Sequence, residues 1–443
     1  MTPNSAVFCN SPWYELQIYW DGALGFCCQE SHVMYAPDDA QKYNIKNMTL
    51  AEWFDSQPMR QARMMMFDAQ RNRVCERCYH EESHGGTSRR HRANQKSVIF
   101  VRENFNDSWL QSPNWEKFHH SQTNQGAHPG LPIDLHIDLG NYCNLTCKMC
   151  RPQASSSIAD QYRQWQIPDA ERYIGTDWTR DQTVWSRVLD ELVSIPNLKN
   201  IHFMGGETLS TPKFEQFVDH MIKCGRQDLC FSFVTNGTKF NARLMGKLTQ
   251  FSRVGIEVSI ESLTAHNAYQ RQGTDTQQVL ENIDRYLGYC DDSKITVTLR
   301  PAVSLLTIGS YHTLLQYALD RGVLVKSLIV SRPAYLAIQI LPDSVRKQYL
   351  EYYHVFAQTN DLDKQNCDQD YSESDPHEIK KVIKNQVLMC KALLTDARDP
   401  SADLLLAQLV HWCKKWDQVH GLDALALYPE LAPIFTQHGY STI

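Results

Sequence analysis

The chain has 443 residues, of which 42% are hydrophobic and 21% charged, a composition typical of folded globular proteins and not of disordered ones. The 44 Lys and Arg residues against 50 Asp and Glu give a net charge of −6, which argues against a broad electrostatic grip on nucleic acid or an anionic membrane. No apolar run approaches the roughly 20 residues that span a bilayer, and the start lacks a signal-peptide pattern. We therefore expect a cytoplasmic protein without a membrane or nucleic-acid partner.

Residues 1–90 are predicted to form a small cysteine-rich domain. Residues 14–27 are β-like and contain Asp21-Gly22, a pair typical of hairpin turns, and residues 50–68 have a helical pattern. In a reducing cytosol, cysteines grouped in this way indicate metal ligands rather than disulfides. The cysteines of this segment are Cys9, Cys27, Cys28, Cys75 and Cys78. Residues 91–132 follow as a predicted linker, rich in Asn, Gln, His and Pro from residue 106 onward.

From residue 133 to 341, predicted strands and helices alternate. Six strand-plus-helix units predict a parallel sheet in an α/β fold, either open or curled into a partial barrel. The predicted strands are residues 133–139, 200–204, 230–235, 253–260, 294–303 and 323–330, and helical patterns include 212–224, 242–251, 276–290 and 311–321. Residues 342–443 have no strand rhythm and are predicted to be an appended helical region.

Three cysteines follow the first of these strands, in residues 139–150, which we call the cysteine loop (Leu-Gly-Asn-Tyr-Cys-Asn-Leu-Thr-Cys-Lys-Met-Cys). The spacing of Cys143, Cys147 and Cys150 lets one loop wrap a compact centre of zinc, copper(I) or iron–sulfur, the metals that thiolates select. No fourth Cys or His follows nearby to close a structural zinc site. Three thiolates on a four-iron cluster would leave one iron open for a substrate or cofactor. A zinc loop with a distant fourth ligand, or three unrelated thiols, is the alternative.

With four downstream motifs, this loop resembles the radical S-adenosylmethionine (SAM) superfamily. The motifs follow successive strands, in the order Gly205-Gly206-Glu207, Thr235-Asn236-Gly237, Ser259-Ile260-Glu261-Ser262 and Arg271. The resemblance implies that Cys143, Cys147 and Cys150 hold a four-iron, four-sulfur cluster. It also implies that SAM is bound by Gly205, Gly206 and Glu207 at its amino group, by Ser259 and Arg271 at its carboxylate, and by Asn236 and Glu261, although Glu261 stands where the family has Asp.

The resemblance further implies a partial (β/α)6 barrel of the TIM type and a radical reaction. One electron from the reduced cluster would cleave SAM to methionine and a 5′-deoxyadenosyl radical, which removes a hydrogen atom from the substrate. The cofactor supplies this chemistry and the protein binds and orients. Implied partners are an electron donor such as a flavodoxin or ferredoxin, and a substrate that is a peptide, a protein or a small polar molecule.

The amino-terminal cysteines are similar to the SPASM/twitch module of radical SAM enzymes, which carries auxiliary iron–sulfur clusters but usually follows the barrel. The resemblance implies one auxiliary cluster, expected to be of the four-iron type, on Cys9, Cys27, Cys75 and Cys78. In a regular strand Cys28 would point to the face opposite Cys27, so we choose Cys27 and keep Cys28 as the alternate. A zinc site of four cysteines uses the same donor atoms and is the alternative interpretation.

Polar and apolar residues alternate in several predicted strands, and in a barrel the apolar face packs under the helices. The polar face, which carries Ser259 and Glu261, predicts a hydrated interior. We hypothesise that Asp138, His202 and Arg300 lie near a polar substrate; an internal ion-pair network is the alternative. The rival function is a non-enzymatic zinc protein that binds RNA or protein, but it gives the Gly-Gly-Glu motif no role. A second enzymatic possibility sacrifices the auxiliary cluster as a sulfur source.

Overall fold

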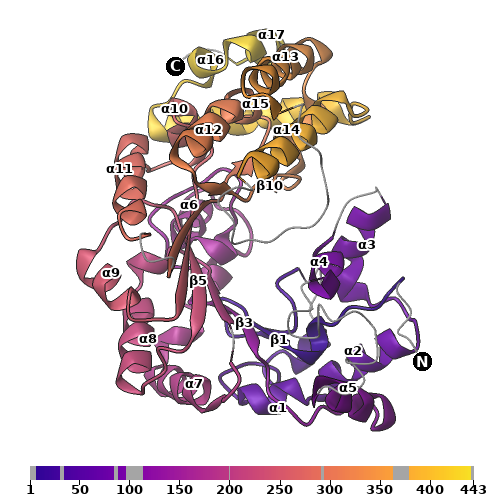
Figure 1. Ribbon diagram of the computed structural model, residues 1–443. Helices are drawn as coiled ribbons and strands as arrows, with labels where there is room; N and C mark the ends of the chain where they lie inside the picture. Colours follow the sequence, from indigo (N-terminus) through magenta and orange to yellow (C-terminus); the bar gives the residue numbers. More distant parts are fainter. Residues whose placement is uncertain are drawn as a thin grey trace. The chain divides into compact units, whose positions relative to one another are not determined.

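The computed structural model describes residues 6–29, 34–83, 88–95, 113–198, 200–290, 294–362 and 379–440. The chain divides into two compact units (Figure 1). The first consists of Met1–Cys143, Pro152–Phe233 and Arg243–Val254, and the second of Asn144–Arg151, Val234–Ala242 and Gly255–Ile443. No described helix combines the length and the apolar character needed to cross a lipid bilayer.

The first unit is built on strands whose hydrogen-bonded order is β2-β1-β3-β4-β5. The strands are β1 Glu15–Ile18, β2 Leu24–Gly25, β3 Asp134–Asp138, β4 Asn200–Met204 and β5 Cys230–Thr235. β1 and β2 form the predicted hairpin, in which Gly22 adopts a φ of +91° at the turn. β1 also pairs in parallel with β3, from Glu15 opposite Asp134 to Ile18 opposite Ile137. The amino-terminal segment and the α/β part therefore share one sheet, which the sequence did not predict.

The first unit contains the helices α1 to α9, of which α1 and α2 replace the single helix predicted over residues 50–68. They are α1 Leu50–Phe54, α2 Gln57–Phe67, α3 Glu76–Ser83, α4 Arg89–Gln95, α5 Pro113–Thr123, α6 Ser156–Gln164, α7 Gln182–Ser194, α8 Pro212–Lys223 and α9 Ala242–Leu248. The helical pattern over 50–68 is split because Asp55 ends α1 and Pro58 starts a new first turn in α2, where its missing N–H costs no hydrogen bond. α5 lies inside the predicted linker, of which residues 96–112 are outside the described ranges.

Helices α7 and α8 lie on one side of strands β3 and β5 (Figure 1). Phe203 of β4 packs against Phe217 of α8, and Phe233 of β5 packs against Phe214 of the same helix, with ring centroids 4.7 Å apart in both pairs. Burying such aromatic side chains is the main force that fixes a helix on a sheet. The predicted apolar face is confirmed for these strands.

The opposite face of this sheet is polar. Gln17, His136, His202 and Ser232 stand side by side across β1, β3, β4 and β5, since each is the register partner of the next. We call these four residues the polar row. All but Ser232 are buried, so their polar atoms need hydrogen-bond partners within the fold.

In the second unit, two predicted strands are each broken in two. The strands are β6 Arg253–Val258, β7 Ile295–Leu299, β8 Ala302–Val303, β9 Leu324–Val325 and β10 Leu328–Ile329. β7 pairs in parallel with β9, whereas β8 and β10 form a separate parallel pair. Pro301 lies between β7 and β8, where proline cannot donate to a ladder. The parallel sheet is confirmed, and the strand order of the described residues is linear, so no closed barrel forms.

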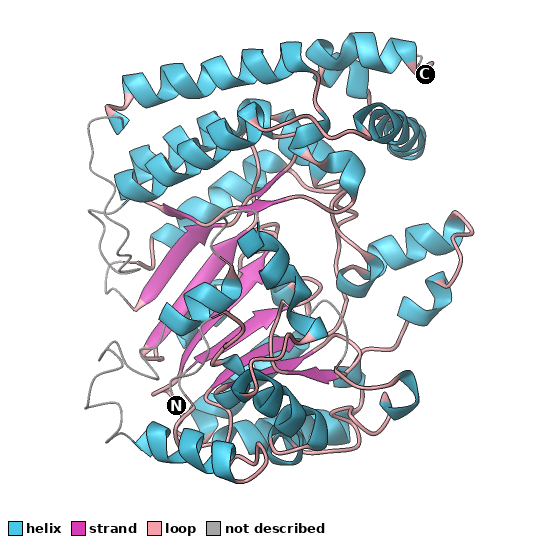
Figure 2. Cartoon of the chain, turned by 90° about the vertical axis from the view of Figure 1, so that its right-hand side faces the viewer, coloured by secondary structure: helices cyan, strands magenta, loops and turns pink. Residues whose placement is uncertain are grey.

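The second unit ends in the helical region that the sequence predicted. Its helices are α10 Ala265–Gln270, α11 Thr276–Leu287, α12 Ile308–Arg321, α13 Asp343–Thr359, α14 Ile379–Thr395, α15 Ala402–His420, α16 Ala424–Leu427 and α17 Ala432–Gln437. Helices α12, α13 and α14 pack on one another, and α15 packs on two short 3-10 segments, Ala334–Leu336 and Ile338–Ile340. Aromatic stacking of Tyr335 on Trp412 holds α15 there. Figure 2 shows helices gathered around the carboxyl terminus.

Candidate active site

The cysteine loop leaves β3 through Gly140, whose φ is +121°. A Cβ at this position would lie 2.7 Å from Oδ1 of Asp177, so only glycine lets the chain pass this close to the carboxylate. The same oxygen accepts the N–H of Asn141 at 2.7 Å. The buried side-chain amide of Asn141 then donates to the carbonyls of Pro152 and Tyr173. Buried hydrogen bonds therefore fix the first arm of the loop.

The Gly205-Gly206-Glu207 turn after β4 packs directly on this arm. Both glycines have positive φ, and a Cβ would lie 2.7 Å from the carbonyl oxygen of Gly140 at position 205 and 2.2 Å from that of Tyr142 at position 206. The N–H of Glu207 donates to the Tyr142 carbonyl at 2.7 Å, and its buried carboxylate accepts the N–H of Leu209. The two glycines therefore let the turn after β4 pack against the backbone of the cysteine loop.

Two serines at the start of α6 hold the first cysteine of the loop. The N–H of Cys143 donates to Oγ of Ser156 at 3.1 Å, and its carbonyl accepts from Oγ of Ser157 at 2.7 Å. Sequence reasoning missed both serines and Asp177. Serine and aspartate next to a helix start are ordinary capping residues, so their type and spacing carried no signal of a link to the cysteines.

In the second unit, the rest of the loop pairs with the segment that follows α10. The N–H of Thr146 donates to the carbonyl of Gln272 at 3.0 Å, and the N–H of Lys148 to that of Gln270 at 2.9 Å. Asn236 donates from Nδ2 to Oδ1 of Asn144 at 2.9 Å. The Thr-Asn-Gly turn that was expected at the cofactor thus also braces the loop.

Two residues predicted to bind the cofactor, Glu261 and Arg271, are bound to each other. Arg271 donates from Nε and Nη2 to the two oxygens of Glu261 at 2.5 and 2.6 Å, and its Nη1 lies 3.7 Å from Sγ of Cys147. Glu261 is fully buried and also accepts the N–H of Ala302 at 3.0 Å. Burial disfavours the charged guanidinium, but Glu261, with the thiols of Cys147 and Cys150, raises the pKa of Arg271 above its usual range.

The donor chemistry of the loop fits a thiolate-bound cluster. The described cysteines are all thiols, with no disulfide among them. Burial raises the pKa of Cys150, while the backbone of Arg151 and the charge of Arg271 lower it. A guanidinium that acts on both Cys147 and Cys150 favours their thiolate forms. Within the described ranges, no three Cys, His, Asp or Glu side chains converge as a metal-holding group. The loop fits an iron–sulfur cluster because it carries three thiols beside the Arg271 guanidinium, and thiolates are the usual ligands of such clusters.

The other predicted residues lie on strands. The N–H of Ser259, which is buried, donates to the carbonyl of Thr235 at 2.8 Å. Nδ1 of His202 lies 2.7 Å from Oγ of Ser232, and its ring centroid is 5.2 Å from that of His136, within the polar row. Asp138 is half-buried at the end of β3, two register pairs from His202.

Arg300, in the second unit, forms an ion pair with Glu257, whose other oxygen lies 3.6 Å from Nζ of Lys326. This is the internal ion-pair network that the sequence left open as the alternative to a substrate contact. Because Glu257 and Arg300 are largely buried, their pairing offsets part of the cost of removing both charges from water.

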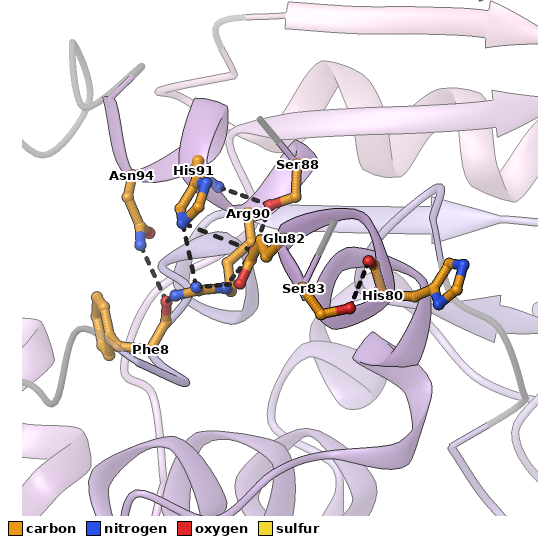
Figure 3. Close-up of polar contacts among 8 residues, drawn as sticks. All are labelled: Phe8, His80, Glu82, Ser83, Ser88, Arg90, His91 and Asn94. Atoms are coloured by element: carbon orange, nitrogen blue, oxygen red, sulfur yellow. Dashed lines mark hydrogen bonds and ion pairs between the residues drawn. The ribbon is translucent and has the colours of Figure 1, made fainter. Parts of the chain in front are cut away.

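A polar network in the first unit joins the segments that carry Cys9 and Cys78 (Figure 3). Arg90 of α4 donates to both carboxylate oxygens of Glu82 in α3, at 2.9 and 2.6 Å, and to the carbonyl of Phe8 at 2.8 Å. Because Phe8 precedes Cys9 and α3 carries Cys78, this arginine holds two predicted ligand segments together. Burial raises the pKa of Cys9 to about 11, with smaller contributions from Glu15 and Cys78.

The adjacent cysteines after β2 have different surroundings. A hydrogen bond from Cys27, and then the charge and hydrogen bond of His136, hold the pKa of Cys28 below its usual range, whereas the bond to Cys28 raises the pKa of Cys27. Cys28 is thus engaged by the polar row through His136. Arg89 of α4 forms an ion pair with the buried Glu15 nearby, and acts on both thiols. Cys27 as the ligand, with Cys28 as the alternate, therefore stays a prediction.

Substitutions at these two positions are expected to differ. Cys27→Ser should remove the auxiliary cluster and lower iron by about four atoms per chain, since a four-iron cluster needs its cysteine ligands. Cys28→Ser should keep that iron. Iron and sulfide analysis of protein purified without oxygen measures both. Iron lost only from Cys28→Ser would assign the ligand to Cys28 instead.

Two family models match this chain. Residues 137–307 match the radical SAM superfamily, and residues 9–79 match an iron–sulfur cluster-binding domain, SPASM. The chain carries a radical SAM domain. The SPASM domain precedes it, so the resemblance read from the cysteine spacing is confirmed in both parts and in their order. A radical SAM domain with a SPASM domain implies iron–sulfur clusters and SAM binding.

Solved structures that match this chain include anSMEcpe with bound AdoMet, at 17% identity, covering 53% of this chain and 62% of that one, with a TM-score of 0.38. Streptococcus suis SuiB bound to S-adenosylmethionine matches at 12% identity, covering 60% of each chain, with a TM-score of 0.37. The chain thus spans about three fifths of the length of these structures. No curated protein sequence matches it.

Proposed function

We propose that this protein is a radical SAM enzyme that reductively cleaves SAM and abstracts a hydrogen atom from a polar substrate, which is a peptide, a protein or a small polar molecule. The observation that carries the proposal is that three of the four predicted SAM motifs contact the three-cysteine loop. The glycines contact its first arm, Asn236 contacts Asn144, and Arg271 contacts Cys147. A zinc-binding interaction protein would have no use for this set of contacts.

In this proposal Cys143, Cys147 and Cys150 hold a four-iron cluster that, when bound, supplies the electron for SAM cleavage. Gly205, Gly206 and Glu207 take the amino group of SAM, and Ser259 and Asn236 complete the cofactor site. Glu261 and Arg271 act together in this proposal. The buried Glu261 carboxylate neutralises Arg271, and Arg271 directs an N–H donor at the Cys147 sulfur, a proposed cluster ligand. Donation to a bound sulfur is one of the levers by which proteins tune such clusters.

The proposed domains are residues 1–90 for the auxiliary cluster, 91–132 for the connection, 133–341 for the radical SAM barrel and 342–443 for the helical region. The auxiliary four-iron cluster is proposed on Cys9, Cys27, Cys75 and Cys78. The electron donor is proposed to be a flavodoxin- or ferredoxin-type protein. The polar row, which includes His202, supports a polar substrate. Asp138, at the end of β3, and Arg300, in the second unit, are the other two residues proposed for it.

The decisive test is anaerobic incubation with dithionite and SAM. We expect 5′-deoxyadenosine and methionine in equal amounts, from brown protein that contains about eight irons per chain. Cys147→Ala should lower the iron by about four and bring 5′-deoxyadenosine below detection, because a three-thiolate cluster loses a ligand. Cys224→Ala is the control, as this cysteine is exposed and outside the motifs. Colourless protein containing zinc, or iron-replete protein without 5′-deoxyadenosine, would contradict the proposal.

A further inference from the structure

Lys148 lies between two of the proposed ligands, yet its side chain is buried, with only 5% of its surface exposed. Its Nζ lies 2.5 Å from the carbonyl oxygen of Tyr269 and 3.8 Å from the centroid of the Tyr269 ring. On another side it lies 4.9 Å from the centroid of the Trp416 ring. A fully buried lysine is rare because burying an ammonium is costly unless its charge is compensated. Here one carbonyl and two aromatic faces compensate it.

The second ring of this cage belongs to α15, in the helical region. Asp417, next to Trp416, is fully buried; its Oδ2 accepts the N–H of Ala424 at 2.7 Å and the hydroxyl of Tyr440. Its Oδ1 has no hydrogen-bond partner within the described residues. Burial lowers the pKa of Lys148 to about 8, but Asp417 and Cys147 are among the groups that oppose this drop. A carboxylate and a thiol therefore both act on the caged amine.

The backbone at Lys148 is held as firmly as its side chain. Its N–H donates to the carbonyl of Gln270 at 2.9 Å. Gln270 is itself fixed, because its Nε2 donates to the carbonyl of Ala302 at 2.8 Å and its Oε1 accepts the hydroxyl of Ser304 at 2.5 Å. Lys148, one of the two residues between Cys147 and Cys150, is therefore held both at its backbone and at the end of its side chain.

We propose that α15 is a clamp on the cysteine loop, in which the Trp416 ring packs on the Lys148 ammonium so that Lys148 positions Cys147 and Cys150 and places a positive charge beside the cluster bound there. The inference deepens the proposed function and rests on it. A nearby cation stabilises the reduced cluster, which is the more negative form, and therefore raises its reduction potential. The clamp also gives the helical region a role at the radical SAM site.

The test uses the full chain, reconstituted with iron and sulfide. Lys148→Met keeps the length of the side chain and removes its charge, and Trp416→Leu keeps an apolar side chain and removes the aromatic face. The matched control is Lys415→Met, because Lys415 lies 5.5 Å from the Trp412 ring on the same helix and makes the same kind of contact outside the cage. Each variant is measured by a potential titration followed by electron paramagnetic resonance and by the rate of iron loss to a chelator.

We expect Lys148→Met to shift the potential of the SAM-responsive cluster to a lower value, and Trp416→Leu to release its iron several-fold faster. Lys415→Met should match the wild type in both. The auxiliary cluster, which does not respond to SAM, reports whether each variant is folded. An unmoved potential together with wild-type iron release in both variants would overturn the clamp alone. If the wild type has no SAM-responsive cluster, the proposed function fails as well.

Discussion

Gly206→Ala is expected to lower the free energy of unfolding by about 2–5 kcal/mol and to strip iron from the cysteine loop. Gly206 has a φ of +59°, and a Cβ there would lie 2.2 Å from the carbonyl oxygen of Tyr142. That oxygen belongs to the backbone and cannot rotate away as a flexible side chain would. Because Tyr142 precedes Cys143, the displacement passes directly to the first proposed cluster ligand.

Gly225→Ala separates the cost of placing alanine at a positive φ from the cost of the clash with the Tyr142 backbone. Gly225 has a similar φ of +72°, but nothing lies within 4 Å of the position of its Cβ. It should therefore cost only the conformational penalty, about 1–2 kcal/mol, and keep its iron. Urea unfolding and iron analysis of both variants measure the difference. Equal losses from the two glycines would show that Gly206 is needed only for its backbone angle.

Glu261→Gln is expected to cost about 3–5 kcal/mol, the usual effect of removing one partner of a buried ion pair. The substitution keeps the size of the side chain but leaves the Arg271 guanidinium buried without a countercharge. It should also loosen the contact between Arg271 and Cys147, at 3.7 Å. The variant should therefore be both less stable and poorer in iron than the wild type.

Two companions make this result interpretable. Asp284→Asn removes the partner of Arg321 in a half-exposed pair of the same unit, and should change stability by less than about 1 kcal/mol. Glu261→Gln combined with Arg271→Met should recover much of the lost stability, since it removes the uncompensated charge. Urea unfolding of the wild type, Glu261→Gln, Arg271→Met and the double variant measures the cycle. If the double variant is as unstable as the sum of its parts, the cost comes from packing and not from charge.

The sequence was most informative where one residue type permits one local structure. β4 and β5 were predicted to the residue, because alternating apolar residues bounded by turn residues have few other interpretations. The motif residues were found because their order along successive strands is specific. The contacts of these residues could not be predicted, because spacing cannot show that Asn236 reaches Asn144. It also cannot show that Glu261, which stands in place of Asp, binds Arg271.

Long-range contacts were beyond the sequence for a physical reason. The pairing of β1 with β3 joins segments more than a hundred residues apart, and a four-residue strand carries no label of its partner. Lys148 looked like an ordinary loop lysine, because its cage comes from Tyr269 and Trp416, which are distant in the sequence. Pro301 was the one local signal that the strand over 294–303 would break, and the apolar pattern around it outweighed that signal.

The pairing of β1 with β3 bears on how the chain is made. β1 supplies four register pairs along the strand that leads into the cysteine loop. A shortened protein without its first ninety residues would begin with β3 as an exposed sheet edge, and such edges recruit strands from other molecules. During synthesis the ribosome delivers β1 first. When β3 emerges, β1 has already been synthesised, so the order of synthesis shortens the time for which β3 lacks its partner strand.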